Sequence, residues 1–268
     1  RFLYGALLTL QAGLVLTGGA VRITGSGLGC PTWPECTPGS YTPVPKQAEG
    51  QLHAWIEFGN RLLTFALVAV SLAVLIHVLY KRRRDLRSLA IGQLLGILGQ
   101  GVLGGITVLT DLHPLPVAGH LLLSIILIAG AASLYSRREH SARPRTDLDK
   151  LTKRISLLHI GLTFVVIILG TIVTGSGPHA GDEKAQRFGF DIRTVAWLHA
   201  DVVIAFIGLL VGYLLLLRFA PVVVDDQLTR ARNREARTLL LITLAQGAIG
   251  YTQYFTGVPE LLVMAHLL

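Results

Sequence analysis

The sequence is poor in charge. Charged residues make up only 15% of its 268 positions, whereas a soluble domain carries roughly 25%. Hydrophobic residues make up 51%, and the mean hydropathy is +0.57. The few charges lie between long apolar runs, and roughly 20 apolar residues suffice to cross the hydrocarbon core of a bilayer. This composition excludes an ordinary soluble domain and predicts a membrane protein with several spans.

The apolar runs predict an all-α fold, a membrane bundle of eight transmembrane helices in two parallel four-helix repeats. An eighth span begins near Pro259 and is cut short at Leu268, so we expect the natural chain to extend beyond both ends of this sequence. The first span lacks a short apolar core followed by a small-residue cleavage site, which argues against a cleavable signal peptide. The other spans are expected near residues 2–22, 54–80, 88–109, 117–136, 155–175, 194–217 and 238–256.

Basic residues outnumber acidic ones by 24 to 16, and they are unevenly spread. Segments 81–87, 137–154 and 218–237 together hold 17 of the 24 Lys and Arg residues. Positive residues stay in the cytoplasm, so odd-numbered spans are expected to run outward and even-numbered spans to run back. We interpret the net charge of +8 as a signal of topology. Nucleic-acid binding is not expected, because no basic surface interleaved with aromatic residues accompanies it.

Cysteine occurs only twice, as Cys30 and Cys36. The Cys–His spacing of a structural zinc site is absent. Both cysteines lie between the first two spans, on the side predicted to be outside, where an isolated pair at short range usually forms a disulfide. Two uses remain open, a structural staple or a redox-active loop, since a strained and exposed disulfide is easier to reduce.

One long segment occurs twice in the chain. Residues 100–120 read QGVLGGITVLTDLHPLPVAGH, and residues 246–266 read QGAIGYTQYFTGVPELLVMAH. Each copy opens with Gln-Gly, passes a turn that contains proline, and ends in a histidine. The tetrapeptide Thr-Gly-Ser-Gly at 24–27 also recurs at 174–177. We therefore predict two related halves, 1–136 and 155–268, joined by a cytoplasmic linker at 137–154.

Three histidines share a predicted depth near the outer leaflet. His120, His199 and His266 each lie near the start of an inward-running span. One buried helical histidine is more often a core residue than a ligand, but three at one depth, two of them at equal repeat positions, favour ligation. Neutral imidazole is a good iron ligand, and helical bundles build cofactor sites from facing helices. The pattern predicts metal ligands in two related metal–porphyrin sites.

A polar stripe opens the second span. Helical spacing places His53, Glu57 and either Asn60 or Arg61 on one face. Ionisable groups inside a membrane cost about 2.5–3.5 kcal/mol at mid-helix and usually mark function. Glu57 is the best candidate for moving protons, and the alternative is an ion pair with Arg61 or Arg22. The two arginines could equally clamp carboxylates, because guanidinium suits their geometry.

Taken together, these features resemble the haem A synthase family over essentially all 268 residues. The resemblance implies an oxidoreductase that converts the C8 methyl group of haem O to a formyl group, giving haem A for cytochrome oxidase. It implies that His199 and His266 bind the iron of a resident haem b, and that His120 faces the substrate haem. The motifs that carry it are Cys-Pro-Thr-Trp-Pro-Glu-Cys at 30–36, Glu57-x-x-Asn60-Arg61, residues 174–182 (TGSGPHAGD) and the matched histidines.

The chain departs from the family at Asn60, where Glu-x-x-His-Arg is common. The iron of the substrate haem is then five-coordinate through His120, or His53 takes the vacant place. The offset from His53 to His199 equals that from His120 to His266, which favours His53. On this reading Glu57 moves protons or stabilises positive charge developing at C8. Arg61 and Arg22 hold the propionates, and the cysteine loop handles haem above the first-half site.

The resemblance also implies partners and a location. The expected partners are haem O as substrate, haem O synthase, cytochrome oxidase assembly factors and membrane lipid, with no nucleic acid; a homo-oligomer is left open. The expected location is the bacterial cytoplasmic membrane, with the cysteine loop outside. A di-haem cytochrome passing electrons from quinone to a partner is the main alternative. A transporter fits less well, because many transporter repeats are inverted with sites at the midplane.

Overall fold

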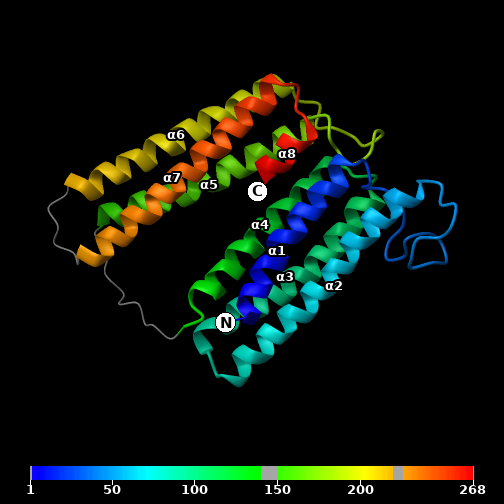
Figure 1. Ribbon diagram of the computed structural model, residues 1–268, viewed down its shortest axis with the longest axis horizontal. Coiled ribbons are helices and arrows are strands. Elements are labelled where there is room, and N and C mark those ends of the chain that lie inside the picture. The colour runs from blue at the N-terminus through cyan, green and yellow to red at the C-terminus, as the bar shows by residue number, and fades with distance from the viewer. Residues whose placement is uncertain (1, 140–149, 220–225, 268) are drawn as a thin grey trace. The chain divides into compact units, whose positions relative to one another are not determined.

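The computed structural model describes residues 2–139, 150–219 and 226–267, and all regular elements in these ranges are helices. The prediction of an all-α fold is therefore confirmed for this part of the chain. Thr37 and Ser40 form an isolated bridge within a loop. The helices, shown in Figure 1, are α1 (Phe2–Ile23), α2 (Gln51–Tyr80), α3 (Arg84–Leu109), α4 (Pro114–Ser136), α5 (Lys150–Ser176), α6 (Ile192–Phe219), α7 (Asp226–Phe255) and α8 (Glu260–Leu267).

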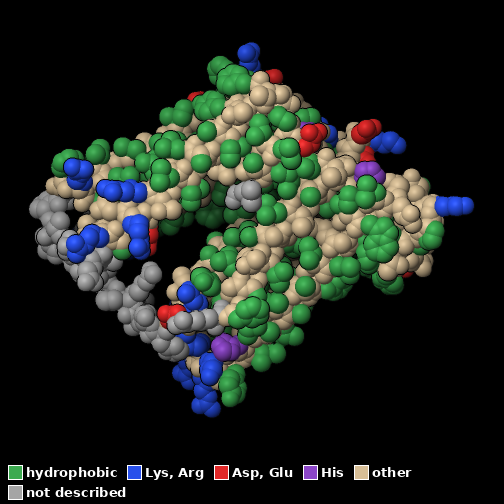
Figure 2. Space-filling view, viewed as in Figure 1, with side chains coloured by type: hydrophobic (Ala, Val, Ile, Leu, Met, Phe, Trp, Pro, Cys, Tyr) green, Lys and Arg blue, Asp and Glu red, His purple; other side chains and the backbone are tan. Residues whose placement is uncertain are grey.

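Six of these helices, α1 to α6, are long and apolar enough to cross a membrane. Figure 2 shows the apolar side chains that cover the flanks of the helices, as expected where lipid replaces water. Helix α7 has the length but not the composition, because arginines occupy its first half. Helix α8 has only 8 residues. The structure fits an integral membrane protein, and the arrangement of eight spans stays a prediction.

Short connections make consecutive helices antiparallel in the first half. Between α2 and α3, Arg82 has a φ of 51° and turns the chain within three residues. Between α3 and α4, Asp111 and Leu112 have φ values of 50° and 57°, and Pro114 then opens α4. Proline suits the first helical position because its missing N–H would have no partner there. These turns place the starts of α2 and α4 at the same end of the bundle.

The described residues divide into two compact units. Of these, residues 2–139 and 174–189 belong to unit 1, and residues 150–173, 190–219 and 226–266 belong to unit 2. The loop at 174–189 therefore packs with unit 1, although it follows α5 in the sequence. Most of the linker predicted at 137–154 lies outside the described residues.

In unit 1, α1 to α4 pack around an apolar core crossed by a chain of amide hydrogen bonds. Gln11 Nε2 donates to Gln93 Oε1 at 3.1 Å, and Gln93 Nε2 donates to the carbonyl oxygen of Leu127 at 2.9 Å. These bonds join α1, α3 and α4, and they satisfy amides that would be costly to bury alone. The core residues are Tyr4, Leu7, Leu67, Val74, Val78, Leu86, Ala90, Ile97, Leu127, Ala131 and Leu134.

In unit 2, a smaller apolar core joins α5, α6 and α7. Phe206, Leu210 and Ala236 form its buried centre. His159 of α5 meets the ring of Phe206 edge to face, with centroids 5.4 Å apart. Its Nδ1 lies 3.0 Å from the carbonyl oxygen of Ile155, so this histidine is held by its own helix.

Candidate functional site

The start of α2 carries a buried ion pair. Arg61 lies one helical turn after Glu57, and its Nη2 and Nε donate to Glu57 Oε1 at 2.5 and 3.1 Å. The backbone N–H of Cys30 donates to Glu57 Oε2 at 2.7 Å. Both carboxylate oxygens of Glu57 are thus engaged, in a residue only 5% exposed. Of the two arginines considered for pairing with Glu57, the structure selects Arg61.

Arg61 also holds the cysteine loop in place. Its Nη2 donates to the carbonyl oxygen of Cys30 at 2.7 Å, and its Nη1 donates to those of Thr32 and Glu35 at 3.1 and 3.2 Å. Cys30 and Cys36 form a disulfide and are fully buried. The predicted disulfide is therefore present. One guanidinium group organises the whole loop around the carboxylate of Glu57.

The cysteine loop lies against α3 beside His120. A methyl group on Gly105 would lie 2.5 Å from the ring of Trp33, so the indole rests directly on the backbone of this glycine. A methyl group on the preceding Gly104 would lie 3.4 Å from Cε1 of His120. Trp33 and His120 therefore approach neighbouring residues of one helix. The motif at 30–36 contains Trp33, but no sequence pattern predicted its contact with Gly105, because the two residues are about 70 positions apart.

A glutamine fixes the backbone under His120. Gln100 Nε2 donates to the carbonyl oxygen of His120 at 3.0 Å and lies 2.6 Å from Ser124 Oγ. The imidazole itself is not held, because its buried Nδ1 has no hydrogen-bond partner among the described residues. A buried polar atom of this kind can take a partner that the protein itself does not supply. Gln100 is the first residue of the first copy of the sequence repeat, so the repeat itself singled out this glutamine.

The other polar residues of the first half have separate partners. His53 Nδ1 lies 2.9 Å from Ser26 Oγ, in the loop after α1. Asn60 Oδ1 accepts from Thr17 Oγ1 at 2.7 Å, deeper along α1. The structure thus places His53 and Asn60 at different levels of the bundle.

Arg22, at the end of α1, fastens the loop that follows α5. Its Nη2 donates to the carbonyl oxygen of Thr174 at 2.5 Å, and its Nε donates to that of His179. Gly27 N–H donates to Gly181 O at 2.8 Å, so segments 24–27 and 174–182 meet within unit 1. Arg22 is therefore occupied with backbone carbonyls rather than with Glu57.

In unit 2, His199 of α6 and His266 of α8 face each other. Their ring centroids are 6.5 Å apart, and the ring planes are inclined by 85°. One metal ion between two imidazole nitrogens would separate the ring centres by roughly 6 Å, given metal–nitrogen bonds of roughly 2 Å. His199 Nδ1 lies 3.1 Å from the carbonyl oxygen of Val166, and this contact orients the ring. Metal-binding histidines commonly use the second nitrogen in this way.

Both rings lie directly against glycines. Methyl groups on Gly170 and Gly250 would lie 3.3 and 3.1 Å from Cε1 of His199 and of His266. Gln246 Nε2 donates weakly to Ala265 O at 3.4 Å, and His266 Nδ1 is buried without a partner in the described residues. Two facing imidazoles are a donor set that suits the ligation of one iron ion.

The sequence repeat is also a repeat of structure. Each half has a glutamine that donates to a carbonyl at the end of the copy, and a glycine four residues later that lies against the histidine. When the two Thr-Gly-Ser-Gly segments at 24–27 and 174–177 are aligned, Thr17, the partner of Asn60, corresponds to Ile167. Ile167 is next to Val166, whose carbonyl oxygen lies close to His199. Asn60 thus contacts α1 at the level where His199 contacts α5. Within the part of the chain that is described, no three His, Cys, Asp or Glu residues form a metal cluster.

Comparison with known proteins agrees with this pattern. The sequence model of the COX15-CtaA family, described as cytochrome oxidase assembly protein, matches residues 1–268. A heme A synthase of Bradyrhizobium sp. (strain BTAi1) is 26% identical over 310 residues, covering 97% of this chain and 85% of that protein. One of Methylobacterium radiotolerans is 28% identical, covering 96% of this chain and 82% of that protein.

A third relative matches over a shorter region. A heme A synthase of Shewanella oneidensis is 30% identical over 176 residues, covering 60% of this chain and about half, 51%, of that protein. No solved structure matches the chain. Because the family match runs through both repeats, their histidines and the cysteine loop, the chain belongs to the COX15-CtaA family of cytochrome oxidase assembly proteins.

Proposed function

We propose that this protein is a haem A synthase, which oxidises the C8 methyl group of haem O to a formyl group in two successive steps. The observation that carries the proposal is the facing pair His199 and His266, which lie 6.5 Å apart beside two glycines. The names of its relatives support the substrate class. The proposed location is the bacterial cytoplasmic membrane, with haem O synthase and oxidase assembly factors as partners.

In this proposal His199 and His266 hold a resident haem b. When bound, haem b supplies one-electron redox chemistry, and the protein supplies its orientation and surroundings. The contact with Val166 fixes the plane of the His199 ring and directs its other nitrogen toward the site. Gly170 and Gly250 allow each ring to lie directly against the backbone of a neighbouring helix, where a larger residue would push the ring away.

Haem O is the substrate of the first-half site, where His120 is the proposed ligand. Asn60 occupies the position in the first half that His199 occupies in the second half. Because an amide is a poor iron ligand, we expect no strong protein ligand opposite His120. His53 is engaged with Ser26 at the level of the loop. This distribution supports five-coordination through His120.

Glu57 and Arg61 form the charged roof of this site. The two steps lead from the methyl group to the alcohol and then to the hydrated aldehyde, which loses water, and the electrons removed from C8 pass to an external oxidant. A carboxylate nearby would accept a released proton or stabilise the positive charge that develops at C8. The ion pair keeps that carboxylate in place, and the Cys30 N–H fixes its second oxygen. Proton transfer would require Glu57 to give up its hydrogen bond with Arg61 or with the Cys30 N–H.

The test is to identify the haems. The full chain would be produced in a bacterial host that makes haem O and no haem A, and the pigments of the purified protein would be separated and weighed by mass spectrometry. We expect haem b, haem O and newly formed haem A. Haem b alone in both halves, with quinone-dependent reduction, would instead establish the di-haem cytochrome, which the paired histidines also fit.

A further inference from the structure

Each half of the chain leaves a glutamine oxygen and a histidine nitrogen without a partner. In unit 1, Oε1 of Gln100 and Nδ1 of His120 are buried and have no hydrogen-bond partner among the described residues, and Gln100 as a whole is only 7% exposed. In unit 2, Oε1 of Gln246 and Nδ1 of His266 are unpaired in the same way. Buried polar atoms are nearly always hydrogen-bonded in native proteins, so a pattern that occurs twice needs a physical reason.

The orientation of both amides follows from their partners. Nε2 of Gln100 donates to the carbonyl oxygen of His120 at 3.0 Å and to Ser124 Oγ at 2.6 Å. A carbonyl oxygen can only accept, so the amide nitrogen is the atom on this side and Oε1 points away from it. The carbonyl oxygen of Ala265 orients Gln246 in the same sense. Both glutamines therefore have an unpaired oxygen, which can only accept a hydrogen bond.

In unit 1 the ring of His120 lies on the same face of α3 as Gln100. Gly104 follows Gln100 by four residues, which places both on one side of the helix. A methyl group on Gly104 would lie 3.4 Å from Cε1 of His120. The ring and the glutamine oxygen are thus neighbours that form no direct hydrogen bond.

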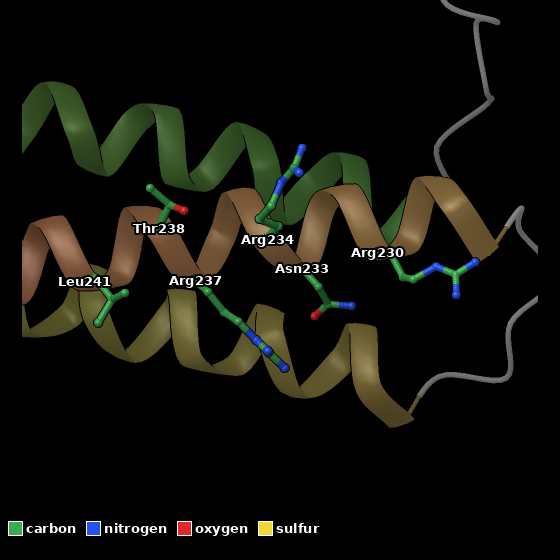
Figure 3. A pocket seen from close by; sticks show the side chains of 6 residues that line it. All are labelled: Arg230, Asn233, Arg234, Arg237, Thr238 and Leu241. Carbon is green, nitrogen blue, oxygen red and sulfur yellow. The ribbon is translucent and has the colours of Figure 1, made fainter.

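Helix α7 repeats this arrangement in unit 2. Gly250 follows Gln246 by the same four residues, and a methyl group on it would lie 3.1 Å from Cε1 of His266. The ring of His266 also lies close to the backbone of Gln246. The charged residues of α7 all precede residue 238, where Arg234 and Arg237 point to opposite sides of the helix (Figure 3). The side-chain acceptor that α7 offers near His266 is therefore an uncharged amide.

A histidine that binds iron through Nε2 carries its proton on Nδ1, which is then a hydrogen-bond donor. A carboxylate, a backbone carbonyl or a water usually accepts from this second nitrogen, fixes the ring and makes it a stronger ligand. In His199 the carbonyl oxygen of Val166 lies 3.1 Å from Nδ1. For His120 the unpaired acceptor on the neighbouring helix face is Oε1 of Gln100.

We propose that Gln100 and Gln246 are positioning residues, whose Oε1 accepts the N–H of Nδ1 of His120 and of His266 through one buried water. The inference rests on the proposed function, because it takes both histidines as haem ligands. One water accepts from Nδ1 and donates to Oε1, so it satisfies both unpaired atoms. The hydrogen bond increases the electron donation of the imidazole to iron, which strengthens the iron–nitrogen bond and favours the ferric state.

The first experiment measures the bond between His120 and iron. The full chain is loaded with haem O, reduced and examined by resonance Raman spectroscopy, in which a five-coordinate ferrous haem gives a strong iron–histidine stretch. Gln100→Met removes the acceptor and should shift this band to lower frequency. Gln100→Glu keeps an oxygen acceptor and should hold the band at or above its wild-type frequency. Ser124→Ala disturbs the donor side of the same amide, leaves Oε1 in place and should not shift the band.

The second experiment measures the reduction potential of the resident haem b. Gln246→Met should raise it by about 59 mV, which corresponds to a tenfold change in the relative stability of the ferric and ferrous forms. Gln246→Glu keeps an acceptor and should not raise it. Thr243→Ala, one turn earlier on α7, removes an exposed hydroxyl that bonds to its own helix, and it should leave the potential unchanged.

The outcomes separate this inference from the proposed function. A wild type without an iron–histidine band would refute five-coordination through His120, and the potentials of the Gln246 variants would then decide the inference. An unchanged band and an unchanged potential in the two Met variants would overturn the inference and leave the haem sites intact. An equal shift in Ser124→Ala would overturn it too, because it would trace the effect to the backbone. If a Met variant does not hold haem, the Glu variant decides, since a lower band or a higher potential there contradicts an acceptor role.

Discussion

A hydrogen bond to one ring nitrogen decides what the other nitrogen of a histidine can do. His199 meets Val166 O through Nδ1, which leaves Nε2 to face the site. His159 has a similar contact with Ile155, yet its ring packs against Phe206 in the core. Two histidines with similar backbone contacts thus differ in surroundings, and only His199 has another histidine opposite. The histidine ring opposite and the glycine backbone against which the ring lies, rather than the residue type, distinguish the proposed ligand.

Replacing either His199 or His266 with Ala should abolish the low-spin spectrum of a bis-imidazole haem b, because one axial ligand is lost. Absorption and electron paramagnetic resonance spectra of the purified protein would measure this. His77→Ala, a change in the first half away from the proposed haem sites, is the matched control and should leave the spectrum intact. An unchanged low-spin signal in both site variants would rule out the assignment.

Replacing Glu57 with Gln separates chemistry from loop anchoring. Glutamine can still accept from the Cys30 N–H, but the ion pair with Arg61 is lost, at a stability cost of about 1.5–3 kcal/mol. If the carboxylate serves the oxidation, the folded variant should keep haem b and accumulate haem O or its alcohol, with little haem A. Pigment analysis per folded molecule is the measurement.

The control for this change lies in the same loop. The side chain of Glu35 accepts from the Gly39 N–H, and only its backbone carbonyl accepts from Arg61, so Glu35→Gln should keep that contact and leave haem A formation normal. Near-normal haem A in Glu57→Gln, together with reduced stability, would refute the catalytic role and leave Glu57 as the anchor of the loop.

At the scale of elements, loops are held by arginine side chains that donate to several backbone carbonyls. Arg61 secures the disulfide loop after α1, and Arg22 secures the loop after α5. Backbone carbonyls in irregular loops need donors, and a guanidinium group offers several in a fixed geometry. Both loops cover the end of unit 1 where α2 and α4 begin, so the roof over the first-half site is built from two distant segments.

Helix α6 begins with a charged cap outside the membrane-spanning segment. Asp191 accepts from the backbone N–H of Thr194 at 2.8 Å and from its hydroxyl at 2.7 Å. These hydrogen bonds, first from the hydroxyl and then from the N–H, hold the pKa of Asp191 below its ordinary value. A lowered pKa contributes stability above the unfolded pKa, and this contribution is lost as the pH falls through the folded pKa.

The cap should therefore make the start of α6 sensitive to acid. We expect the melting temperature of the wild type to exceed that of Asp191→Asn at pH 6 and the difference to shrink below about pH 4, where the carboxylate becomes protonated. Asparagine is itself a good cap, so the comparison isolates the charge. A difference that stays constant across this pH range would contradict the prediction.

For the whole molecule, the uneven distribution of basic residues predicts sidedness. Segments 81–87 and 218–237 are expected in the cytoplasm, and the loop with the disulfide is expected outside. Ala48 is exposed in the loop expected outside, and Arg87 is exposed in segment 81–87, expected in the cytoplasm.

Single cysteines at these positions would test the orientation in intact cells. Ala48→Cys should react with a membrane-impermeant maleimide, and Arg87→Cys should react only after lysis. The native pair Cys30–Cys36 gives no background while it is oxidised, and the wild type serves as the control for this. Labelling of Arg87→Cys in intact cells would show that the orientation is the reverse of the predicted one.

Much of the molecule follows from local patterns in the sequence. Apolar runs of sufficient length predicted the helices, within a few residues at most ends, because helix formation and burial in lipid depend on neighbouring residues. The repeat likewise predicted the matched positions of His120 and His266. The seventh helix departs from the expectation, because α7 begins at Asp226, inside the basic segment 218–237, whereas the sequence predicted a span only over 238–256.

Local sequence patterns therefore predict the helices, their repeat and the residues that can ligate a metal or carry charge. Which of these residues contact one another depends on the tertiary structure. The sequence left both Arg61 and Arg22 as possible ion-pair partners of Glu57. In the folded chain Glu57 pairs with Arg61, because Arg22 donates to the carbonyl oxygens of Thr174 and His179. Trp33 meets Gly105 across about 70 residues. Such contacts depend on how helices and loops pack in three dimensions, and helical periodicity carries no information about them.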